Sequence, residues 1–440
     1  MPAIAVHDLS RLDGAARAEL LRRSEADLSE YRGKVAPIIE AVRERGDEAL
    51  AEFGRRFDRA DVTADRLAAT PADFDAAEAA LDADVRQAMA FAAERIRRFH
   101  ERQMPEDMWL QEMGRGVMAG ERALPIPSVA CYVPRGKGAF PSVALMTTIP
   151  AVVAGVEKVI VVTPPTEDGS IDDATLHACH LAGVSEVYKC GGAQAVAAVA
   201  YGTGTVPKVA KIVGPGSPWL VAAMQELADV IDVGPPAGPS ESIVLADSTA
   251  DPRVTALDLL NEAEHGPDSS AFLVTDDTAL ADKVIAEIDG LFGHMGAERV
   301  SYCRTVLSGT NGGIVIAADM DEACAFVNDY APEHLMVESA DPWAYVPKLR
   351  HAGEILLGGH TAIAVANYVL GPNHVLPTGG WARTRSPLSV FDYMKRQTIA
   401  YVTDEGYPAL APQARAFARY EGFEAHANAV SRLREGGDKP

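Results

Sequence analysis

The segment LLNEAEHGPDS, residues 259–269, holds a carboxylate and an imidazole three positions apart at the end of an apolar run. Glu262 and His265 would share one face of a helix, which the Gly-Pro pair directly behind them would end. Oxygen and nitrogen ligands of this kind suit a divalent ion such as zinc. Two ligands do not complete a metal site, so spacing alone favours a solvated helix end.

The other acid–base candidates are scattered along the chain. Glu333 and His334 are adjacent in NDYAPEHLMV, at the expected entry of a strand. Neighbouring side chains on a strand point to opposite faces, so only a loop conformation would turn both toward one cavity. From pattern alone, His374 in GPNHVLPT reads as a structural histidine, and His426 in EGFEAHANAV reads as a solvated one.

Glycine-rich turns follow several expected strands: PRGKGAFPS from Pro134, GGAQA from Gly191 and GPGSPW from Gly214. Each could bring backbone N–H groups to a phosphate at a helix start, although a tight strand-to-helix turn explains each equally well. No G-x-G-x-x-G fingerprint falls between a strand and a helix. Together these turns favour a nucleotide-binding globule.

The elements that must position these residues alternate between strand and helix. Short β-rich runs begin near residues 129, 158, 186, 211 and 230, and a second series begins near 242, 271, 312, 334 and 353. Continuous apolar strands that alternate with helices are typical of parallel, doubly wound sheets. Helices are also expected over residues 15–60, 71–103, 386–396 and 411–434.

Composition narrows the class of protein. The formal net charge of −22 argues against a nucleic-acid partner or an anionic membrane surface, because both need a basic footprint. Five scattered cysteines without a CxxC pair fit reduced thiols in the cytoplasm. The N-terminus lacks the pattern of a signal peptide, and apolar windows such as 142–156 are too short to span a bilayer.

Taken together, the motifs GGAQA, GPG, AGPSES, EAEHGPDS, APEHL, GPNHVLPT and A-H-x-N-A-V resemble the histidinol dehydrogenase family, in order over nearly the whole chain. The resemblance implies two incomplete Rossmann-like, doubly wound globules, with a helical N-terminal region and a C-terminal helical tail exchanged in a homodimer. The expected parts are 1–127, a helical region packing on globule 1; 128–238, globule 2 on the NAD side; 239–385, globule 1 with the metal and catalytic residues; and 386–440, the dimerisation tail.

The same resemblance implies an activity and a role for each candidate. Members oxidise a primary alcohol through an aldehyde to a carboxylate, with two NAD and one zinc, for which manganese is the alternative metal. His334 would be the general base, and Glu333 would activate the attacking water. The implied metal ligands are Glu262, His265, Asn367 and His426, the last reaching into the partner subunit. The implied substrate contacts are Ser240, Glu262, His265, His334, Asn367, Glu421 and His426, and the implied NAD contacts are Tyr132, Gln194 and Ser217.

The chain departs from this pattern at the metal site. In histidinol dehydrogenases proper, the position of Glu262 is a glutamine and that of Asn367 is an aspartate, so carboxylate and amide are exchanged here. The ligand charge is unchanged, but the negative charge moves to another side of the ion. Ser217 replaces an asparagine typical of the family, which puts that cofactor contact in doubt. These changes indicate a site re-aimed at another substrate.

Basic residues near the expected cleft, Arg135, Lys137, Arg383 and Arg385, suit an anionic group, although solvated loop charges explain them equally well. The segments NEAEHGPDS and GGWARTRSP look like the branch of the family that oxidises sulfopropanediol to sulfolactate. The expected substrate is therefore a small anionic alcohol such as 2,3-dihydroxypropane-1-sulfonate. The alternatives are L-histidinol, in histidine biosynthesis, and a catalytically silent binding protein.

Overall fold

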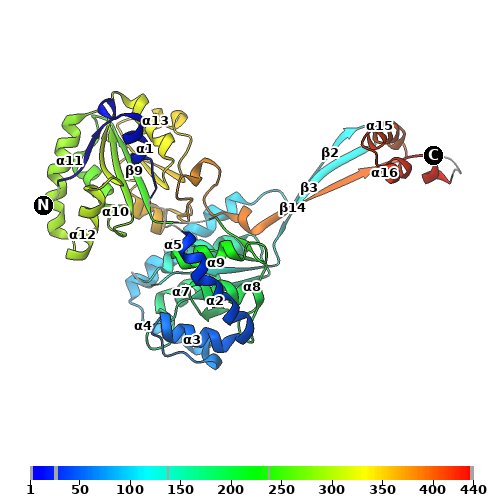
Figure 1. The fold of residues 1–440 in the computed structure, drawn as a ribbon, viewed down its shortest axis with the longest axis horizontal. Helices are drawn as coiled ribbons and strands as arrows, with labels where there is room; N and C mark the ends of the chain where they lie inside the picture. The colour runs from blue at the N-terminus through cyan, green and yellow to red at the C-terminus, as the bar shows by residue number, and fades with distance from the viewer. Residues whose placement is uncertain (1–2, 24–27, 136–137, 236–237, 437–440) are drawn as a thin grey trace. The chain divides into compact units, whose positions relative to one another are not determined.

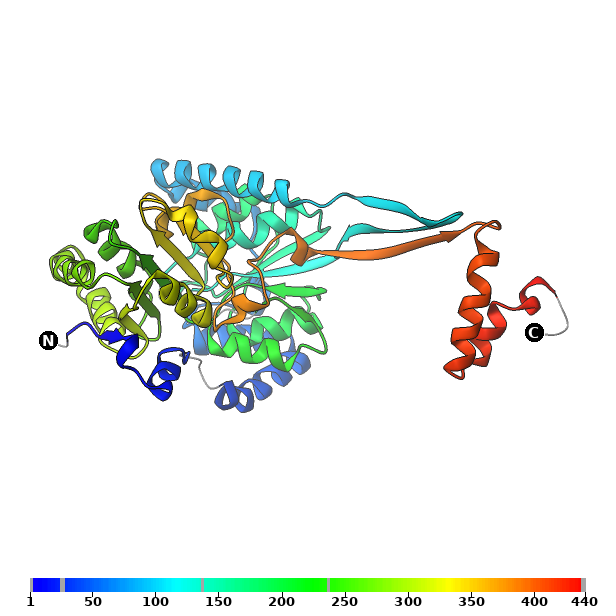
Figure 2. The same cartoon turned by 90° about the horizontal axis from the view of Figure 1, so that it is seen from above.

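The computed structural model describes residues 3–23, 28–135, 138–235 and 238–436. The chain divides into two compact units (Figures 1 and 2). Unit 1 comprises Met1–Gln103 and Ile126–Tyr393, and unit 2 comprises Met104–Pro125 and Met394–Pro440.

Unit 1 contains two parallel sheets, of which sheet A has six strands in the order β1-β11-β10-β9-β12-β13. Its strands are β1 (Val6–Asp8), β9 (Glu241–Ala246), β10 (Ser270–Thr275), β11 (Gly312–Ile316), β12 (His334–Glu338) and β13 (Glu354–Leu357). Its helices are α1 (Gly14–Leu20), α10 (Pro252–Ala263), α11 (Thr278–Leu291), α12 (Ala297–Leu307) and α13 (Met320–Tyr330). Alternate strand residues pack on opposite faces, Val244 with α10–α12 and Ile243 with α1 and α13. Because both faces are covered, the central positions of strands β9–β13 are apolar.

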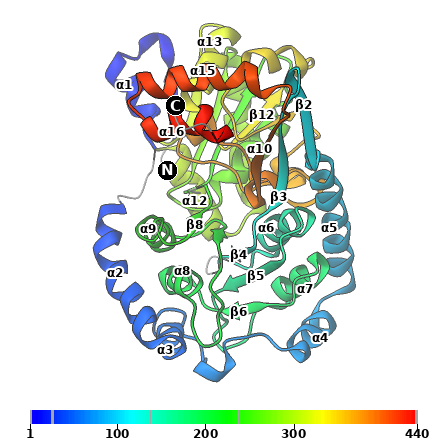
Figure 3. The same cartoon turned by 90° about the vertical axis from the view of Figure 1, so that its right-hand side faces the viewer.

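Sheet B has five parallel strands in the order β6-β5-β4-β7-β8. They are β4 (Ser128–Tyr132), β5 (Lys158–Thr163), β6 (Val187–Lys189), β7 (Lys211–Val213) and β8 (Asp232–Val233). Helices α2 (Leu28–Arg45), α3 (Asp47–Phe57), α8 (Gly192–Tyr201) and α9 (Pro218–Glu226) cover one face. Helices α4 (Pro71–Ala80), α5 (Ala83–Gln103), α6 (Pro141–Val153) and α7 (Asp173–Ala182) lie together on the other, as Figure 3 shows.

The two sheets repeat one strand order. In sheet B, β4 lies between β5 and β7. In sheet A, β9 occupies the equivalent place between β10 and β12. Sheet A differs only in gaining β1 at the edge beside β11. This arrangement confirms the predicted parallel α/β architecture, because the order of strands reverses beside the first strand in a doubly wound sheet.

Unit 2 is built on an antiparallel sheet. Strand β3 (Val117–Pro125) pairs with β2 (Met108–Gly114) on one side and with β14 (Met394–Val402) on the other. The chain then forms helices α15 (Tyr407–Tyr420) and α16 (Glu424–Ala429). No residue of α15 is buried among the described residues, so its apolar side chains are exposed.

The structure corrects two expectations. The helix expected over 386–396 is wrong: a short 3-10 turn at Val390–Tyr393 leads directly into β14, because pairing with β3 outweighs the helical propensity of Met, Lys, Arg and Gln. The N-terminal region does not pack on globule 1 as a whole. Only β1 and α1 join sheet A, whereas α2–α5 pack on sheet B and β2 and β3 belong to unit 2.

Two further expectations concern the surroundings of the protein. The five cysteines are buried free thiols. Within the described residues, no helix combines the length and the apolar character needed to cross a membrane.

Candidate active site

Helix α10 carries the first pair of candidates to the start of strand β9. The Asp251 side chain caps its first turn by accepting hydrogen bonds from backbone N–H groups. In its last turn, the Glu262 side chain is only 1% exposed. His265 lies in the turn just beyond the helix, where its N–H donates to the Glu262 carbonyl at 3.2 Å. The pair therefore shares one helix end, as the spacing predicted.

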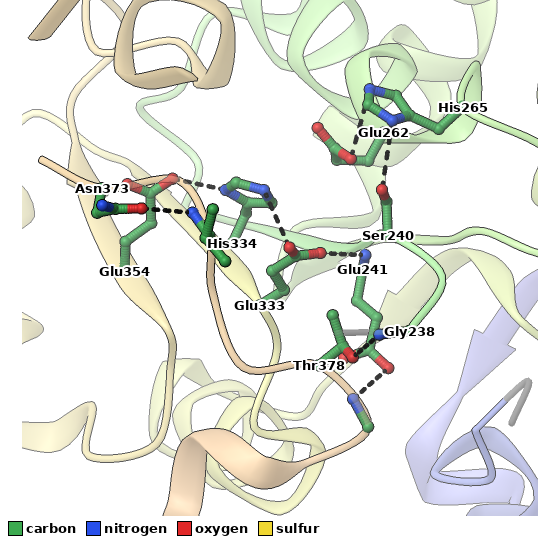
Figure 4. A network of polar contacts seen from close by, with 12 residues as sticks. Gly238, Ser240, Glu241, Glu262, His265, Glu333, His334, Glu354, Asn373 and Thr378 are labelled. Atoms are coloured by element: carbon green, nitrogen blue, oxygen red, sulfur yellow. Dashed lines mark hydrogen bonds and ion pairs between the residues drawn. The ribbon is translucent and has the colours of Figure 1, made fainter. Parts of the chain in front are cut away.

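The side chains of this helix end meet a serine that precedes β9 (Figure 4). His265 Nε2 lies 3.7 Å from Glu262 Oε2, and its Nδ1 lies 3.3 Å from Ser240 Oγ. Glu262 Oε2 is buried, and nothing in the described part of the chain donates a hydrogen bond to it. A buried carboxylate oxygen without a donor is destabilising, and a cation bound there would offset this cost. The carbonyls at a helix C-terminus favour a cation at the same place.

Asn367 lies in a π-helical turn, Ala366–Leu370, that follows the short helix α14 (Ile363–Val365). Such turns are rare and often occur at functional sites. The Asn367 Oδ1 atom is buried and finds no hydrogen-bond partner among the described residues. Ala366 packs in the same core cluster as Ala263 of α10. The turn that carries Asn367 is therefore anchored beside the helix that carries Glu262.

These donors fit zinc or manganese chemically. A carboxylate oxygen, an imidazole nitrogen and an amide oxygen are ligands that such ions accept, and both oxygens are buried without partners. Across the described ranges, no group of three His, Cys, Asp or Glu side chains could by itself hold a metal ion. The candidate ligands in unit 1 are Glu262, His265 and Asn367, and only the first two belong to those four residue types.

The second pair lies at the start of β12. Helix α13 ends at Ala331, whose φ of 53° is left-handed, and Pro332 follows. This turn leaves Glu333 outside the strand while His334 is its first residue. Both side chains are buried, with Glu333 Oε1 3.8 Å from His334 Nε2. The loop conformation needed to bring these neighbours together is therefore present.

A further carboxylate, which the sequence reasoning missed, completes this cluster. Glu354 is the first residue of β13, directly beside His334 in the parallel register. Its Oε1 lies 2.5 Å from His334 Nδ1 (Figure 4). The signal in the sequence was a carboxylate that opens the otherwise apolar strand EILL.

Burial and mutual charge set the protonation of this cluster. Burial, with the nearby Glu262 carboxylate, raises the pKa of Glu333 to about 8. Burial alone would lower the pKa of His334, but the charges of Glu333, Glu354 and Glu262 outweigh burial and raise it. Glu333 and His334 therefore hold their protons to higher pH than isolated side chains do, and shifted pKa values of this kind are typical of acid–base sites.

A backbone framework holds the Glu333 carboxylate in place. Its Oε2 accepts a hydrogen bond from the Glu241 N–H at 3.0 Å, and Glu241 Oε1 accepts one from the Gly379 N–H at 3.1 Å. Arg23 lies 3.3 Å from the Glu241 carboxylate and stacks over the Tyr330 ring, with its Cζ 3.2 Å from the centroid. Glu333 is thus oriented by groups that belong to the fold.

His374, which the pattern indicated as structural, lies close to this cluster. Burial and the charge of His334 lower the pKa of His374 to about 4, so its imidazole is neutral. It also makes a hydrogen bond with the backbone of Ser142, in the first turn of α6. The segment that carries His374 therefore connects the start of β12 with the helix that follows β4.

The candidate NAD contacts gather where strands of sheet B end. Tyr132 is the last residue of β4, and its hydroxyl accepts a hydrogen bond from the Gly192 N–H at 3.1 Å. Gln194 lies in the first turn of α8, and Ser217 precedes α9 without capping it. A Cβ at Gly214 would lie 2.2 Å from the Tyr132 carbonyl, so this turn requires glycine. Ligands of doubly wound sheets bind at this position, beside the reversal of strand order between β4 and β7.

Glu421 and His426 belong to unit 2, unlike the other candidates. Glu421 is the residue after α15, and His426 lies in α16. Both side chains are exposed, and the His426 ring lies 5.2 Å from that of Phe423.

The basic residues of the expected rim have different surroundings. Arg383 donates hydrogen bonds to the carbonyls of Gly380 and Asp329, so it braces its own loop. Arg385 lies over the Trp381 ring at 5.2 Å, and Arg135 donates to the Pro165 carbonyl at 3.4 Å. Lys137 lies outside the described residues. Arg383 and Arg135 therefore each donate to backbone carbonyls of the fold.

Comparisons with known proteins agree over the whole chain. The family model described as histidinol dehydrogenase matches residues 21–434. The histidinol dehydrogenase homolog 2 of Mesorhizobium japonicum is 55% identical over 435 residues, which cover 99% of both chains. The histidinol dehydrogenase of Synechocystis is 47% identical over 96% of this chain and 97% of its own. The crystal structure of histidinol dehydrogenase from Elizabethkingia anophelis has a TM-score of 0.92 at 32% identity and covers 98% of each chain.

Proposed function

The chain belongs to the histidinol dehydrogenase family, a family of NAD-dependent oxidoreductases that use zinc, and on this premise we propose that it oxidises a primary alcohol to a carboxylate. One alcohol, one water and two NAD+ would yield one carboxylate, two NADH and three protons, by way of an aldehyde. We propose 2,3-dihydroxypropane-1-sulfonate as the type of substrate and sulfolactate as the product.

The observation that carries this proposal is the buried Glu333–His334 pair near the Glu262 carboxylate, whose Oε2 accepts no hydrogen bond from the described residues. In each oxidation a hydride leaves carbon only as a proton leaves oxygen, so a base must lie next to the reacting carbon. His334 Nε2 would accept the alcohol proton, because its Nδ1 is already occupied by Glu354. The elevated pKa of Glu333 lets this carboxyl accept and release the proton of the attacking water near neutral pH.

The cofactors fit residues of the two globules. NAD would lie at the ends of β4 and β7, beside Tyr132 and Gln194, and the segment holding His374 links this place to the catalytic pair. Glu262, His265 and Asn367 would hold zinc or manganese. When bound, that ion would hold the substrate and polarise its oxygen.

The position of His426, the fourth candidate ligand, supports a homodimer in which each chain contributes residues to the other chain's site. His426 and Glu421 lie in unit 2, where the side chains of Phe417 and Tyr420 on α15 are 71% and 90% exposed. Aromatic side chains this exposed are typical of an interface. We propose that unit 2 packs on a second copy of the chain and supplies His426 and Glu421 to its site.

The choice of substrate rests on where negative charge lies. Glu262 and Asn367 exchange carboxylate and amide relative to histidinol dehydrogenases proper, which changes the surroundings of a substrate amine or imidazole. Several relatives at 54–55% identity, including those of Colwellia psychrerythraea and Rhizobium meliloti, are named only as homologs of histidinol dehydrogenase. Both facts favour an alcohol other than histidinol.

Steady-state NADH production with the two alcohols tests the proposal. We expect turnover of the dihydroxypropane sulfonate and little turnover of L-histidinol; the reverse result would assign the protein to histidine biosynthesis. His334→Ala should lower kcat by about 10²–10⁴-fold, the usual contribution of a general base. If the wild-type protein oxidises neither alcohol and binds no NAD, a silent binding protein is the better description.

A further inference from the structure

We propose that Glu354 is a positioning residue that sets the orientation and the tautomer of His334, so that Nε2 alone is available to the substrate. This inference rests on the proposed role of His334 as the base.

The backbone brings the two side chains together. His334 and Glu354 are direct neighbours in the parallel pairing of β12 and β13, and the Glu354 N–H donates to the Glu333 carbonyl at 3.1 Å. A Cβ at Gly353 would lie 2.5 Å from the same carbonyl. Glycine before Glu354 is therefore what allows β13 to approach the catalytic turn so closely.

The contact assigns the tautomer of His334. Its Nδ1 lies 2.5 Å from Glu354 Oε1, and both side chains are about nine-tenths buried or more, at 4% and 10% exposed. A carboxylate can only accept a hydrogen bond, so Nδ1 must carry the proton. The lone pair of the neutral ring is then on Nε2, which faces Glu333 at 3.8 Å.

No other charged group near His334 is placed to do the same. Glu333 from the preceding turn and Glu262 from α10 act on it through charge, whereas the neutral His374 makes its hydrogen bond to the backbone of Ser142. The Glu333 carboxylate is already held by the Glu241 N–H. In the described part of the chain, Glu354 is therefore the group that fixes the ring.

The consequence is chemical as well as geometric. When the alcohol O–H bond breaks, its proton moves to Nε2 while the hydride moves from carbon to NAD+. The imidazolium formed on His334 then lies against the Glu354 carboxylate, which stabilises its charge, as the orienting carboxylate does in other histidine-based sites. The Nδ1 proton stays in place throughout.

Glu354→Gln and Glu354→Ala separate charge from geometry, and Glu338→Gln is the matched control. Glu338 is also a buried glutamate of sheet A, at the other end of β12 from His334. The first readout is the ¹⁵N imidazole titration of His334, assigned by the signal that His334→Gln removes, and it needs no substrate. The second is the pH profile of kcat/KM for NADH production.

We expect Glu354→Gln to move the His334 titration and the acid limb of the profile to lower pH by at least about one unit. It should lower kcat by about 10²-fold with little change in KM, by the usual effect of an orienting group, and Glu354→Ala should lose more. Glu338→Gln should leave both midpoints unchanged.

The inference is overturned if Glu354→Gln changes neither midpoint while His334→Ala abolishes activity. It is also overturned if Glu338→Gln moves both midpoints as far, because the effect would then be one of general destabilisation. Should His334→Ala retain full activity, the role of His334 as base fails, and the ¹⁵N titration still decides whether Glu354 controls its tautomer.

Discussion

Replacing Glu262 by glutamine should stabilise the metal-free protein and remove most of the stabilisation that a bound metal ion provides. The carboxylate is 1% exposed, and its Oε2 has no donor among the described residues. Without a cation, a buried charge in this position destabilises the fold; with one, it becomes a ligand. The same substitution should therefore stabilise the metal-free protein and weaken its binding of the metal ion.

The magnitudes are large enough to measure. Replacing the buried charge with a neutral amide should stabilise the metal-free variant by about 1–3 kcal/mol. Zinc at about 100 times its dissociation constant would stabilise the wild type by about 2.7 kcal/mol. If loss of the carboxylate weakens binding about 100-fold, the same zinc concentration would stabilise the variant by only about 0.4 kcal/mol.

Thermal unfolding of six samples tests this: the wild type, Glu262→Gln and a control variant are each measured in chelator and in zinc. We expect the Glu262→Gln midpoint to exceed that of the wild type in chelator, and we expect zinc to stabilise the wild type by about 2.3 kcal/mol more than the variant. Glu264→Gln is the matched control, because it removes the same charge from a partly exposed residue at the same helix end. Equal stabilisation of wild type and Glu262→Gln by zinc and by manganese would refute the assignment of Glu262 as a ligand.

Three further results are expected. Burial and the neighbouring Asp258 raise the pKa of Glu338 to about 8 from 4.5, so the folded state holds a proton that the unfolded state has lost. Stability should therefore fall by up to about 5 kcal/mol as pH rises through this window, and Glu338→Gln should flatten the decline in pH-dependent denaturation. Glu333→Gln should stop the reaction at the aldehyde, so that the NADH formed per alcohol falls from two toward one in an end-point assay; an unchanged yield would exclude Glu333 as the group that activates water. Gly214→Ala, whose Cβ would lie 2.2 Å from the Tyr132 carbonyl, should raise KM for NAD without altering stabilisation by zinc in thermal melts.

Much of the fold follows from patterns that are local in sequence. Strands such as β9 and β10 contain runs of four apolar residues, Ile243–Ala246 and Ala271–Val274, because helices cover both faces of sheet A, and these runs are visible without a structure. Strand β14 shows the limit of this reasoning. Its residues are mostly exposed, and Lys395–Thr398 in its first half are polar. The strand forms because it pairs with β3, about 275 residues earlier.

The candidate site divides in the same way. Glu262 and His265 were predicted to share a helix end, and α10 ends there. Glu333 and His334 needed a loop conformation that no spacing rule predicts, and the left-handed Ala331 supplies it. Glu354 was missed because its importance comes entirely from its place beside His334 in the sheet.

The sequence by itself determined the alternating α/β elements, the helix end at Glu262, and the residue types that oxidation of an alcohol would need. Only the tertiary structure decided which of those residues meet. Propensity and hydrophobic periodicity act within one turn or one strand, whereas strand register and burial depend on segments far apart in the chain. His334 and Glu354 are 20 residues apart in sequence, and the register of two strands places their side chains 2.5 Å from each other.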